Sequence, residues 1–412
     1  MQTHLSPEYQ GTADGTAAEA ILRKCVHCGF CTATCPTYQL LGDELDGPRG
    51  RIYLIKQVLE GATPTRATQS HLDRCLTCRN CETTCPSGVQ YGQLVEIGRR
   101  VVDAKVRRPA RERAVRWLLK TGLTSPAFQP AMALGKLVRP LLPAALKDKV
   151  PASAPARAHL WPRREHQRKV LLLLGCVQPA MLPNINSATA RVLDAAGIQT
   201  LVADDAGCCG AIRSHLNDHH GGLRDMRRNI DAWWPQVIAG SAEAIVMNAS
   251  GCGLTVKEYG QALAHDPAYA DKAQRISALT RDLSELLPSI VSALKPRFAA
   301  RAEANVLAFH PPCTLQHGQQ LRGGVEAGLR ALGYDVSLAA NDAHLCCGSA
   351  GTYSVLQPEL AHQLRDNKLT QLTANAPQTI ISANIGCIQH LQSGTATPVR
   401  HWIEVLDEAL GG

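Results

Sequence analysis

Cys25-Val-His-Cys-Gly-Phe-Cys-Thr-Ala-Thr-Cys-Pro36 is a motif that this chain uses twice, the second time as Cys75-Leu-Thr-Cys-Arg-Asn-Cys-Glu-Thr-Thr-Cys-Pro86. Both copies read C-x2-C-x2-C-x3-C-P. In this pattern three cysteines lie on a tight loop, and the fourth begins a helix at a proline. The repeated motif therefore predicts a helical domain of the ferredoxin type, built around two [4Fe-4S] clusters.

The two motifs are expected to interlock, because the fourth cysteine of each copy reaches the cluster of the other copy. This arrangement places the two clusters close together, as an electron relay requires. Two sets of ligands follow from it. The first cysteine set is Cys25, Cys28, Cys31 and Cys85, and the second cysteine set is Cys75, Cys78, Cys81 and Cys35.

A zinc site and a disulfide framework are the alternatives to clusters. Zinc knuckles use pairs of C-x2-C, and they lack three cysteines at three-residue steps with a fourth before proline. Disulfides need an oxidising compartment, and residues 1–24 have no apolar segment of a secretory signal. The spacing and the sixteen cysteines therefore favour iron–sulfur ligation in a reducing cytosol.

Positive charge is concentrated in one segment of the 412-residue chain. Residues 105–169 carry sixteen Lys and Arg but three acids, a net charge of +13, whereas the whole chain carries +8. Residues 110–120 have the pattern of an amphipathic helix, and residues 151–168 have the composition of a linker. The segment is either a solvated spacer or an element that docks on a membrane surface or a partner. Aromatic residues make up 4% of the chain, which argues against a nucleic-acid partner.

The remainder of the chain repeats itself. Cysteine landmarks, strand-like runs and helix-like runs of residues 170–300 recur in the same order in residues 301–412. Apolar strands alternate with helices in each copy, which predicts two small parallel α/β domains. The fold class is thus α/β with an α-helical N-terminal domain. The expected domains are residues 1–104 for the clusters, 105–169 as basic connector, 170–300 as repeat one and 301–412 as repeat two.

Four further cysteines occur in each repeat, next to Gly-rich turns or predicted strand ends. They could bind a third metal centre, act as a redox thiol pair, or be buried small side chains. We expect a pseudo-two-fold relation that turns both groups toward a shared cleft. Histidines near the cysteines of repeat two have no counterparts in repeat one, so we do not expect them to be metal ligands. The repeat cysteines are Cys176, Cys208, Cys209 and Cys252, then Cys313, Cys346, Cys347 and Cys387, and those histidines are His310, His317, His344 and His390.

Several segments together resemble the iron–sulfur subunits of bacterial glycolate oxidase (glycolate dehydrogenase). Beside the two cluster motifs, these segments are Asp46-Gly-Pro-Arg-Gly-Arg-Ile-Tyr53, Asp231-Ala-Trp-Trp-Pro235, Cys313-Thr-Leu-Gln-His317, Leu345-Cys-Cys-Gly-Ser-Ala-Gly-Thr352 and Val399-Arg-His-Trp-Ile403. The resemblance covers nearly the whole chain and is weakest over the connector.

The resemblance implies an electron-transfer subunit without catalytic residues of its own. Flavoprotein partners carrying FAD would oxidise glycolate to glyoxylate, and this chain would pass electrons toward quinone at the cytoplasmic face of the inner membrane. No G-x-G-x-x-G fingerprint follows a strand here, so the hydride acceptor is expected on a partner. The alternative is a catalytic subunit like heterodisulfide reductase, whose repeats end in C-x-x-C. Here Ala249 and Asn384 occupy the first of those positions, which argues against that activity.

Overall fold

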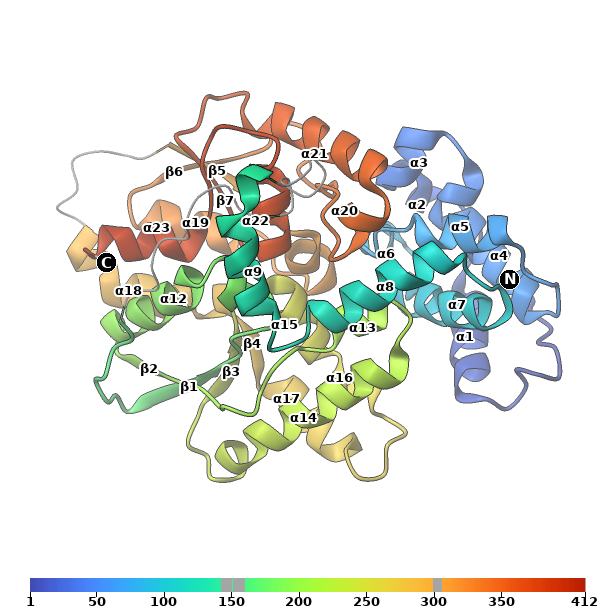
Figure 1. Cartoon of the computed structure of the whole chain (residues 1–412), viewed down its shortest axis with the longest axis horizontal. Coiled ribbons are helices and arrows are strands. Elements are labelled where there is room, and N and C mark those ends of the chain that lie inside the picture. The colour runs from blue at the N-terminus through green and yellow to red at the C-terminus, as the bar shows by residue number, and fades with distance from the viewer. Residues whose placement is uncertain (142–149, 151–159, 299–305, 412) are drawn as a thin grey trace.

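The computed structural model describes residues 1–141, 150, 160–298 and 306–411. Its N-terminal part is helical, as predicted, and Figure 1 shows it in blue at one end of the molecule. The helices are α1 (Ala13–Lys24), α2 (Phe30–Ala33), α3 (Pro36–Leu41), η1 (Glu44–Asp46), α4 (Pro48–Leu59), α5 (Arg66–Asp73), α6 (Asn80–Thr84) and α7 (Tyr91–Lys105).

Local signals fix where these helices begin. Pro36 and Pro48 occupy the first turns of α3 and α4, where a missing N–H costs nothing. Helices α4 and α7 pack closely because α7 has Gly98 at the contact, where a Cβ atom would lie 2.5 Å from Ile55. The buried core between the helices also contains Cys25 and Cys75, so the cluster motifs are part of the domain's interior.

The basic connector forms two helices that lie across the front of the molecule in Figure 1. They are α8 (Ala110–Gly122) and α9 (Phe128–Leu137), followed by η2 (Arg139–Leu141). The amphipathic helix expected over residues 110–120 is therefore present and slightly longer. Half of the expected linker over residues 151–168, namely residues 151–159, lies outside the described residues. Among the residues that are described, none of the helices has the length and apolar content to cross a membrane.

Each repeat contains a four-stranded parallel sheet, which confirms the predicted fold class. The strand orders are β2-β1-β3-β4 and β6-β5-β7-β8, so the two sheets share one topology. Repeat one is made of β1 (Arg168–Leu172), α11 (Gln178–Met181), α12 (Asn184–Ala195), β2 (Ile198–Leu201), α13 (Ala211–His215), α14 (His219–Ile238), β3 (Ala244–Met247), α15 (Ser250–Lys257), α16 (Tyr259–Ala262), α17 (Ala270–Leu279), β4 (Thr280–Asp282), η3 (Leu283–Leu286) and α18 (Leu287–Phe298). Repeat two is made of β5 (Val306–His310), η4 (Thr314–Gly318), α19 (Gly324–Ala331), β6 (Asp335–Leu338), α20 (Tyr353–Leu356), α21 (Pro358–Leu372), β7 (Thr379–Ser382), α22 (Ile385–Gln392), β8 (Val399–His401) and α23 (Trp402–Ala409).

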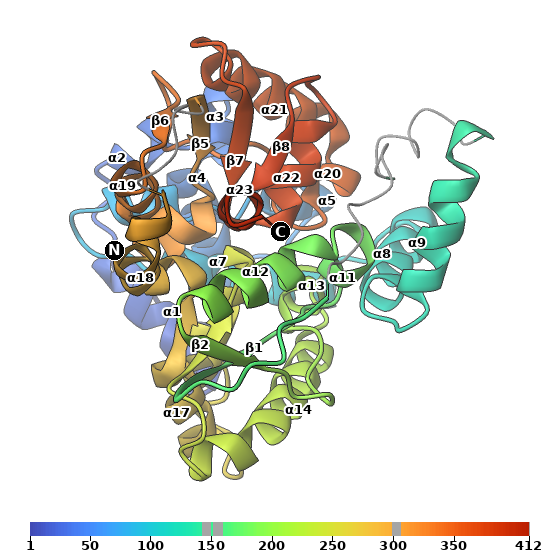
Figure 2. The same cartoon turned by 90° about the vertical axis from the view of Figure 1, so that its left-hand side faces the viewer.

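The repeats exchange their last helices. Helix α18, which ends repeat one, packs on α19 of repeat two, and α23, which ends repeat two, packs on α12 of repeat one. Figure 2 shows α12 and α23 lying between the two sheets. Arg191 on α12 forms a bidentate ion pair with Asp407 on α23, and Asn184 donates to Glu404 over 3.0 Å. Reciprocal packing of this kind gives the repeats one joint core and fits the expected pseudo-two-fold relation.

Candidate functional site

Both cluster motifs turn their loops with left-handed residues at the same two positions. His27 and Gly29 flank the second cysteine of the first loop, with φ of 56° and 83°. Thr77 and Arg79 flank the second cysteine of the other loop, with φ of 53° and 59°. Three of these four residues are not glycine, so the loops carry backbone strain that ordinary turns avoid. The shared conformation wraps each loop around a common centre, as ligation of a bulky inorganic group requires.

The thiols of the first cysteine set lie around a small cavity of about 30 Å³. Burial raises the pKa of Cys31 to about 11, and three neighbouring thiols add to that rise. Those neighbours belong to Cys25, Cys28 and Cys85, the last of which comes from the other motif. Such a group of crowded thiols loses its protons together only when positive charge, such as iron, lies between them.

The second cysteine set is more deeply buried. Burial raises the pKa of Cys81 far above its usual range, and the neighbouring thiols of Cys78, Cys75 and Cys35 raise it further. The hydroxyl of Tyr91 donates to Cys75 Sγ over 3.6 Å. Both sets therefore contain three cysteines of one motif and the fourth of the other. The thiol chemistry of both sets suits [4Fe-4S] clusters.

Two buried arginines lie beside the second cysteine set. Arg51 is 1% exposed, donates to His71 O over 2.7 Å, and forms an ion pair with Asp46. Arg99 donates to Cys75 O over 2.6 Å. Their charge favours an anionic group nearby. Arg51 lies within the Asp46–Tyr53 segment that carried the family resemblance, whereas nothing in the sequence singled out Arg99.

The second cluster motif contacts repeat two directly. Cys78 packs against a buried cluster that includes Cys313 and Cys346. Hydrogen bonding to Cys346 and to Cys78, together with burial, raises the pKa of Cys313 well above its usual range. Asn80 donates to Thr34 O over 3.0 Å and to His344 O over 3.3 Å. The thiols of the second cysteine set are thus continuous with the thiols of repeat two.

An ion pair fixes the same motif to repeat one. Arg79, one of the left-handed loop residues, forms a bidentate ion pair with Glu258, which precedes α16. The ion pair raises the pKa of Arg79 against the opposing effect of burial. One loop therefore touches both repeats, and its conformation is tied to their positions.

A cavity of about 1220 Å³ connects the repeats, the second motif and the connector. It fulfils the expectation of a shared cleft, although Cys208 does not line it. Val115, Leu119 and Phe128 of the connector line it too, so the apolar side of the amphipathic helix faces the cavity. The cysteines that line it are Cys78, Cys176, Cys209, Cys252, Cys313, Cys346, Cys347 and Cys387.

The thiols within each repeat are hydrogen-bonded in a row. In repeat one, hydrogen bonds from Cys176 and Cys209 lower the pKa of Cys208, and Cys209 is also bonded to Cys252. In repeat two, the thiol of Cys347 is hydrogen-bonded to the thiols of Cys346 and Cys387. The four cysteines of each repeat therefore converge, which argues against the view that they are unrelated core residues.

The histidines near the cysteines of repeat two have different roles. His317 Nε2 donates to His344 O over 2.8 Å, so its Nδ1 accepts, and Thr83 of the cluster domain lies 3.2 Å from it. His390 Nε2 donates to Ala361 O over 3.0 Å. His317 therefore helps to dock the cluster domain on repeat two. Of these four histidines His310 is different, because its Nε2 is buried and has no hydrogen-bond partner among the described residues, as is also the case for His401 Nε2 elsewhere in repeat two.

Comparison with known proteins agrees with this architecture. Residues 21–89 match the 4Fe-4S dicluster domain, and residues 170–257 and 307–392 match the Cysteine-rich domain. The chain is 56% identical to "Glycolate oxidase iron-sulfur subunit" of Escherichia coli (strain K12), over 100% of this chain and 99% of the relative. It is 28% identical to "Probable glycolate oxidase iron-sulfur subunit" of Bacillus subtilis (strain 168), over 95% of each. "Lactate utilization protein A" of the same Bacillus strain is 23% identical over 58% of this chain and 99% of the relative.

Proposed function

This chain belongs to the family of glycolate oxidase iron–sulfur subunits, and from that premise we propose that it carries electrons from a glycolate-oxidising flavoprotein to a quinone. Removal of two electrons from a 2-hydroxy acid as a hydride needs an organic acceptor such as FAD. When bound, two [4Fe-4S] clusters supply the one-electron carriers that accept this pair singly. The chain itself has no dinucleotide fingerprint, so the flavin belongs to partner subunits.

The ligands of this relay are the two cysteine sets. Cys25, Cys28 and Cys31 with Cys85 hold one cluster, and Cys75, Cys78 and Cys81 with Cys35 hold the other. Convergence of the thiols in these two groups, and the matching left-handed loop residues, support the assignment. The division into residues 1–104, 105–169, 170–300 and 301–412 belongs to the same proposal.

The observation that carries the proposal is the unequal surroundings of the two motifs. Cys28 is exposed, and beside it Val26 and Phe30 present apolar side chains to solvent. An exposed apolar patch next to a cluster loop suits the docking of a protein that donates electrons. At the other motif Cys78 lies against Cys313 inside the molecule. Electrons accepted at the exposed loop are therefore delivered toward the repeats and their cavity.

The cavity suits a quinone as the acceptor. Its connector side is apolar and it reaches the thiols nearest the second cysteine set. Apolar lining with a few polar groups is typical of sites for small organic molecules. The apolar lining favours this role over that of a heterodisulfide-reductase-like catalyst. The residues Ala249 and Asn384, which replace cysteines of the C-x-x-C element, also count against that catalyst.

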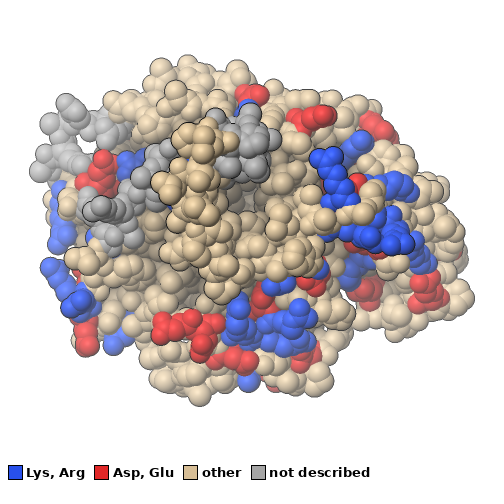
Figure 3. Space-filling model, viewed as in Figure 1, with Lys and Arg blue, Asp and Glu red and all other residues tan. Residues whose placement is uncertain are grey.

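The connector is the element proposed to contact the membrane at its cytoplasmic face. Trp117 and Leu118 on α8 and Leu137 on α9 are exposed apolar side chains. Basic side chains gather in Figure 3 where α8 begins, and the surface over α9 is largely uncharged. Arg108 does not belong to the free charge, because it is buried and bonded to Asp73. Basic and apolar residues together are the combination that binds anionic lipid surfaces.

Vesicle binding tests the membrane contact. Changing Arg107, Arg111 and Arg113 to Gln removes three exposed charges, each worth about 1 kcal/mol at an anionic surface. We expect roughly hundredfold weaker binding to anionic vesicles at low salt, and a smaller difference at high salt. The matched control makes the same change at exposed arginines of repeat one, namely Arg275, Arg281 and Arg297. Equal loss in both triple variants would mean that net charge alone acts.

Co-purification tests the core of the proposal. The chain, purified without a tag, should bring a flavoprotein with it. Glycolate should then reduce the clusters of the complex, which is seen as bleaching of their visible absorption. The chain alone should not respond to glycolate. A chain that oxidises glycolate without flavin would contradict the proposal.

A further inference from the structure

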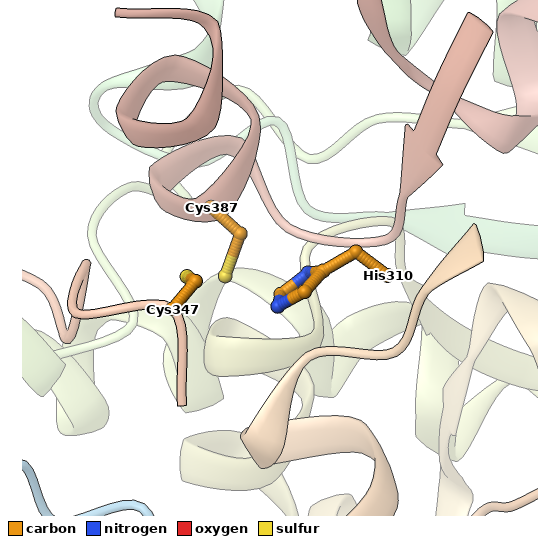
Figure 4. Close-up of side chains that lie close together, drawn as sticks. All are labelled: His310, Cys347 and Cys387. Atoms are coloured by element: carbon orange, nitrogen blue, oxygen red, sulfur yellow. The ribbon is translucent and has the colours of Figure 1, made fainter. Parts of the chain in front are cut away.

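We propose that repeat two holds a single divalent transition-metal ion, with zinc as the best match, on His310 Nε2, Cys347 Sγ and Cys387 Sγ. One ligand atom from each residue lies within 4.8 Å of the other two, and all three residues are buried. Figure 4 shows the imidazole and the two thiols turned toward one another. The site is separate from the eight ligands of the clusters and does not rest on the electron-transfer function.

The three residues come from three segments that meet at one edge of the sheet. His310 ends β5, Cys347 lies in the Cys-Cys-Gly turn, and Cys387 is in the first turn of α22. The carboxyl ends of parallel strands form such an edge, where α/β sheets bind their ligands. A tetrahedral zinc ion with bonds of about 2.0–2.3 Å separates its ligand atoms by roughly 3.5–3.8 Å. The observed limit of 4.8 Å therefore requires only small side-chain adjustments.

Hydrogen bonding fixes the tautomer of His310 in the form that binds metal. Ser382 Oγ donates its single proton to His310 O over 3.0 Å. The same oxygen lies 3.1 Å from His310 Nδ1, so Nδ1–H must be the donor in that contact. Nε2 then carries the lone pair, and within the described residues it has no partner although His310 is only 1% exposed.

An unpaired buried acceptor destabilises the fold, and a metal ion bound to its lone pair removes that cost. Metal-bound histidines commonly donate their other N–H to a neighbouring oxygen, as His310 does to Ser382. Asn384 supplies a similar contact on the sulfur side, since its Nδ2 donates to Cys387 Sγ over 3.6 Å. The residues around the three ligands are thus arranged to hold them in place.

Comparison of the repeats shows that this polar pair is not a requirement of the fold. His310 and Ser382 are register partners on β5 and β7. In repeat one the register Leu172↔Val246 continues to Leu173 and Met247, which occupy the corresponding places. Repeat two therefore has a buried polar pair where repeat one has two apolar side chains. A buried polar pair specific to one repeat points to a ligand specific to that repeat.

The ligand chemistry selects the class of ion. Two sulfurs and an imidazole suit zinc and similar borderline ions, and they exclude calcium and magnesium, which prefer oxygen. Binding releases the two thiol protons to solvent, so two thiolates balance the two charges of the ion. All three ligand residues line the large cavity, and the fourth coordination position therefore faces it. That position accepts water or a small oxygen or sulfur donor.

Metal analysis of the full chain, purified anaerobically with its clusters, tests the proposal. We expect about eight irons and about one zinc per chain. His310→Leu, which installs the residue type of repeat one, should lose the zinc and keep the irons. Cys387→Ser should do the same. The matched control is Cys252→Ser, the corresponding change in repeat one, which should keep the zinc.

Cobalt supplies a readout that loss of folding does not imitate. The chain loaded with Co²⁺ alone should show the visible absorption of a tetrahedral site. His310→Cys should retain the ion with an absorption shifted toward that of three sulfur ligands. Three results would each overturn the proposal. They are the absence of zinc or cobalt from the wild-type chain, retention of the ion in both His310→Leu and Cys387→Ser, and loss of four irons instead of one zinc in Cys387→Ser.

Discussion

The two cluster motifs have the same spacing and the same left-handed loop residues, but they have opposite surroundings. Val26 in the first loop is 68% exposed, whereas Leu76 at the same place in the second loop is 5% exposed. Phe30 is 61% exposed, and its counterpart Asn80 is 3% exposed. The second loop is covered because repeat two packs on it, and no other domain covers the first loop in the described part of the chain.

This difference teaches that the motif determines the conformation of each loop. Tertiary packing determines which loop is left exposed for a partner and which is covered by the rest of the chain. A cysteine pattern places four sulfurs, but it does not say which loop meets a partner and which meets the rest of the chain. The contacts of Asn80 and Cys78 with repeat two supply that information. The second cysteine set also receives a hydrogen bond on sulfur, which Tyr91 donates to Cys75.

The largest effect is expected from removing one cluster ligand, either in the exposed loop or in the covered loop. Cys28→Ser and Cys78→Ser should each lose or convert one of the two clusters, because each thiolate bonds one iron. In the complex, glycolate should fail to reduce the cluster that remains in Cys28→Ser. It should still reduce the one that remains in Cys78→Ser, where only onward delivery is blocked. Electron paramagnetic resonance after addition of glycolate distinguishes these outcomes.

Each of these two variants is the control for the other. Identical behaviour of both would show that electrons do not enter at the exposed loop, and the assignment of direction would be wrong. Stoichiometric zinc without acid-labile sulfide in the unmodified cluster domain would remove the basis of the whole comparison.

A charge placed on the exposed loop should have the next largest effect. Phe30→Glu introduces a carboxylate into the apolar patch proposed to dock the flavoprotein. Interface residues of this type contribute about 1–3 kcal/mol, so we expect roughly tenfold to hundredfold weaker partner binding with both clusters intact. Binding is measured by titration of the purified partner. Leu338→Glu, at an exposed leucine of repeat two, is the matched control and should leave the affinity unchanged.

The smallest effect is expected from the loss of one hydrogen bond, which should change the reduction potential of the covered cluster alone. Tyr91→Phe removes the donor to Cys75 Sγ, and donors to sulfur raise the reduction potential of a cluster. One hydrogen bond of about 0.5–1.5 kcal/mol corresponds to roughly 20–60 mV for a single electron. Redox titration should show the second cluster shifted downward by this amount. Tyr53→Phe, beside the first loop, should shift neither cluster, and an equal shift in both variants would argue against the hydrogen bond as cause.

Much of this architecture follows from the sequence. The motif spacing predicts the helical cluster domain, and the recurring landmarks predict two parallel sheets with one topology. These features are periodic or local, so a single sequence contains them. The exchange of α18 and α23 between repeats is not predicted, because it depends on long-range packing between similar apolar faces.

The sequence does not place the buried charges and histidines of this chain. Arg108 belongs to the basic segment by composition, but it pairs with Asp73 in the interior. The lack of counterparts in repeat one predicts that the histidines near the cysteines of repeat two take no part in ligation. For His310 that lack is itself the informative signal, because alignment of the repeats places Leu173 opposite a buried imidazole.

The exchanged helices also govern how the chain can be made. Arg191 and Asp407 form an ion pair across 216 residues of sequence, so α12 is synthesised long before α23. Until α23 emerges, α12 packs on β2, α11 and α18 but lacks the helix that covers its other side, so the core of repeat one is incomplete. Contacts of such long separation fold slowly and expose aggregation-prone surface in the meantime. Repeat one therefore completes its core only after repeat two has been synthesised, and removal of α23 would damage the domain that is synthesised first.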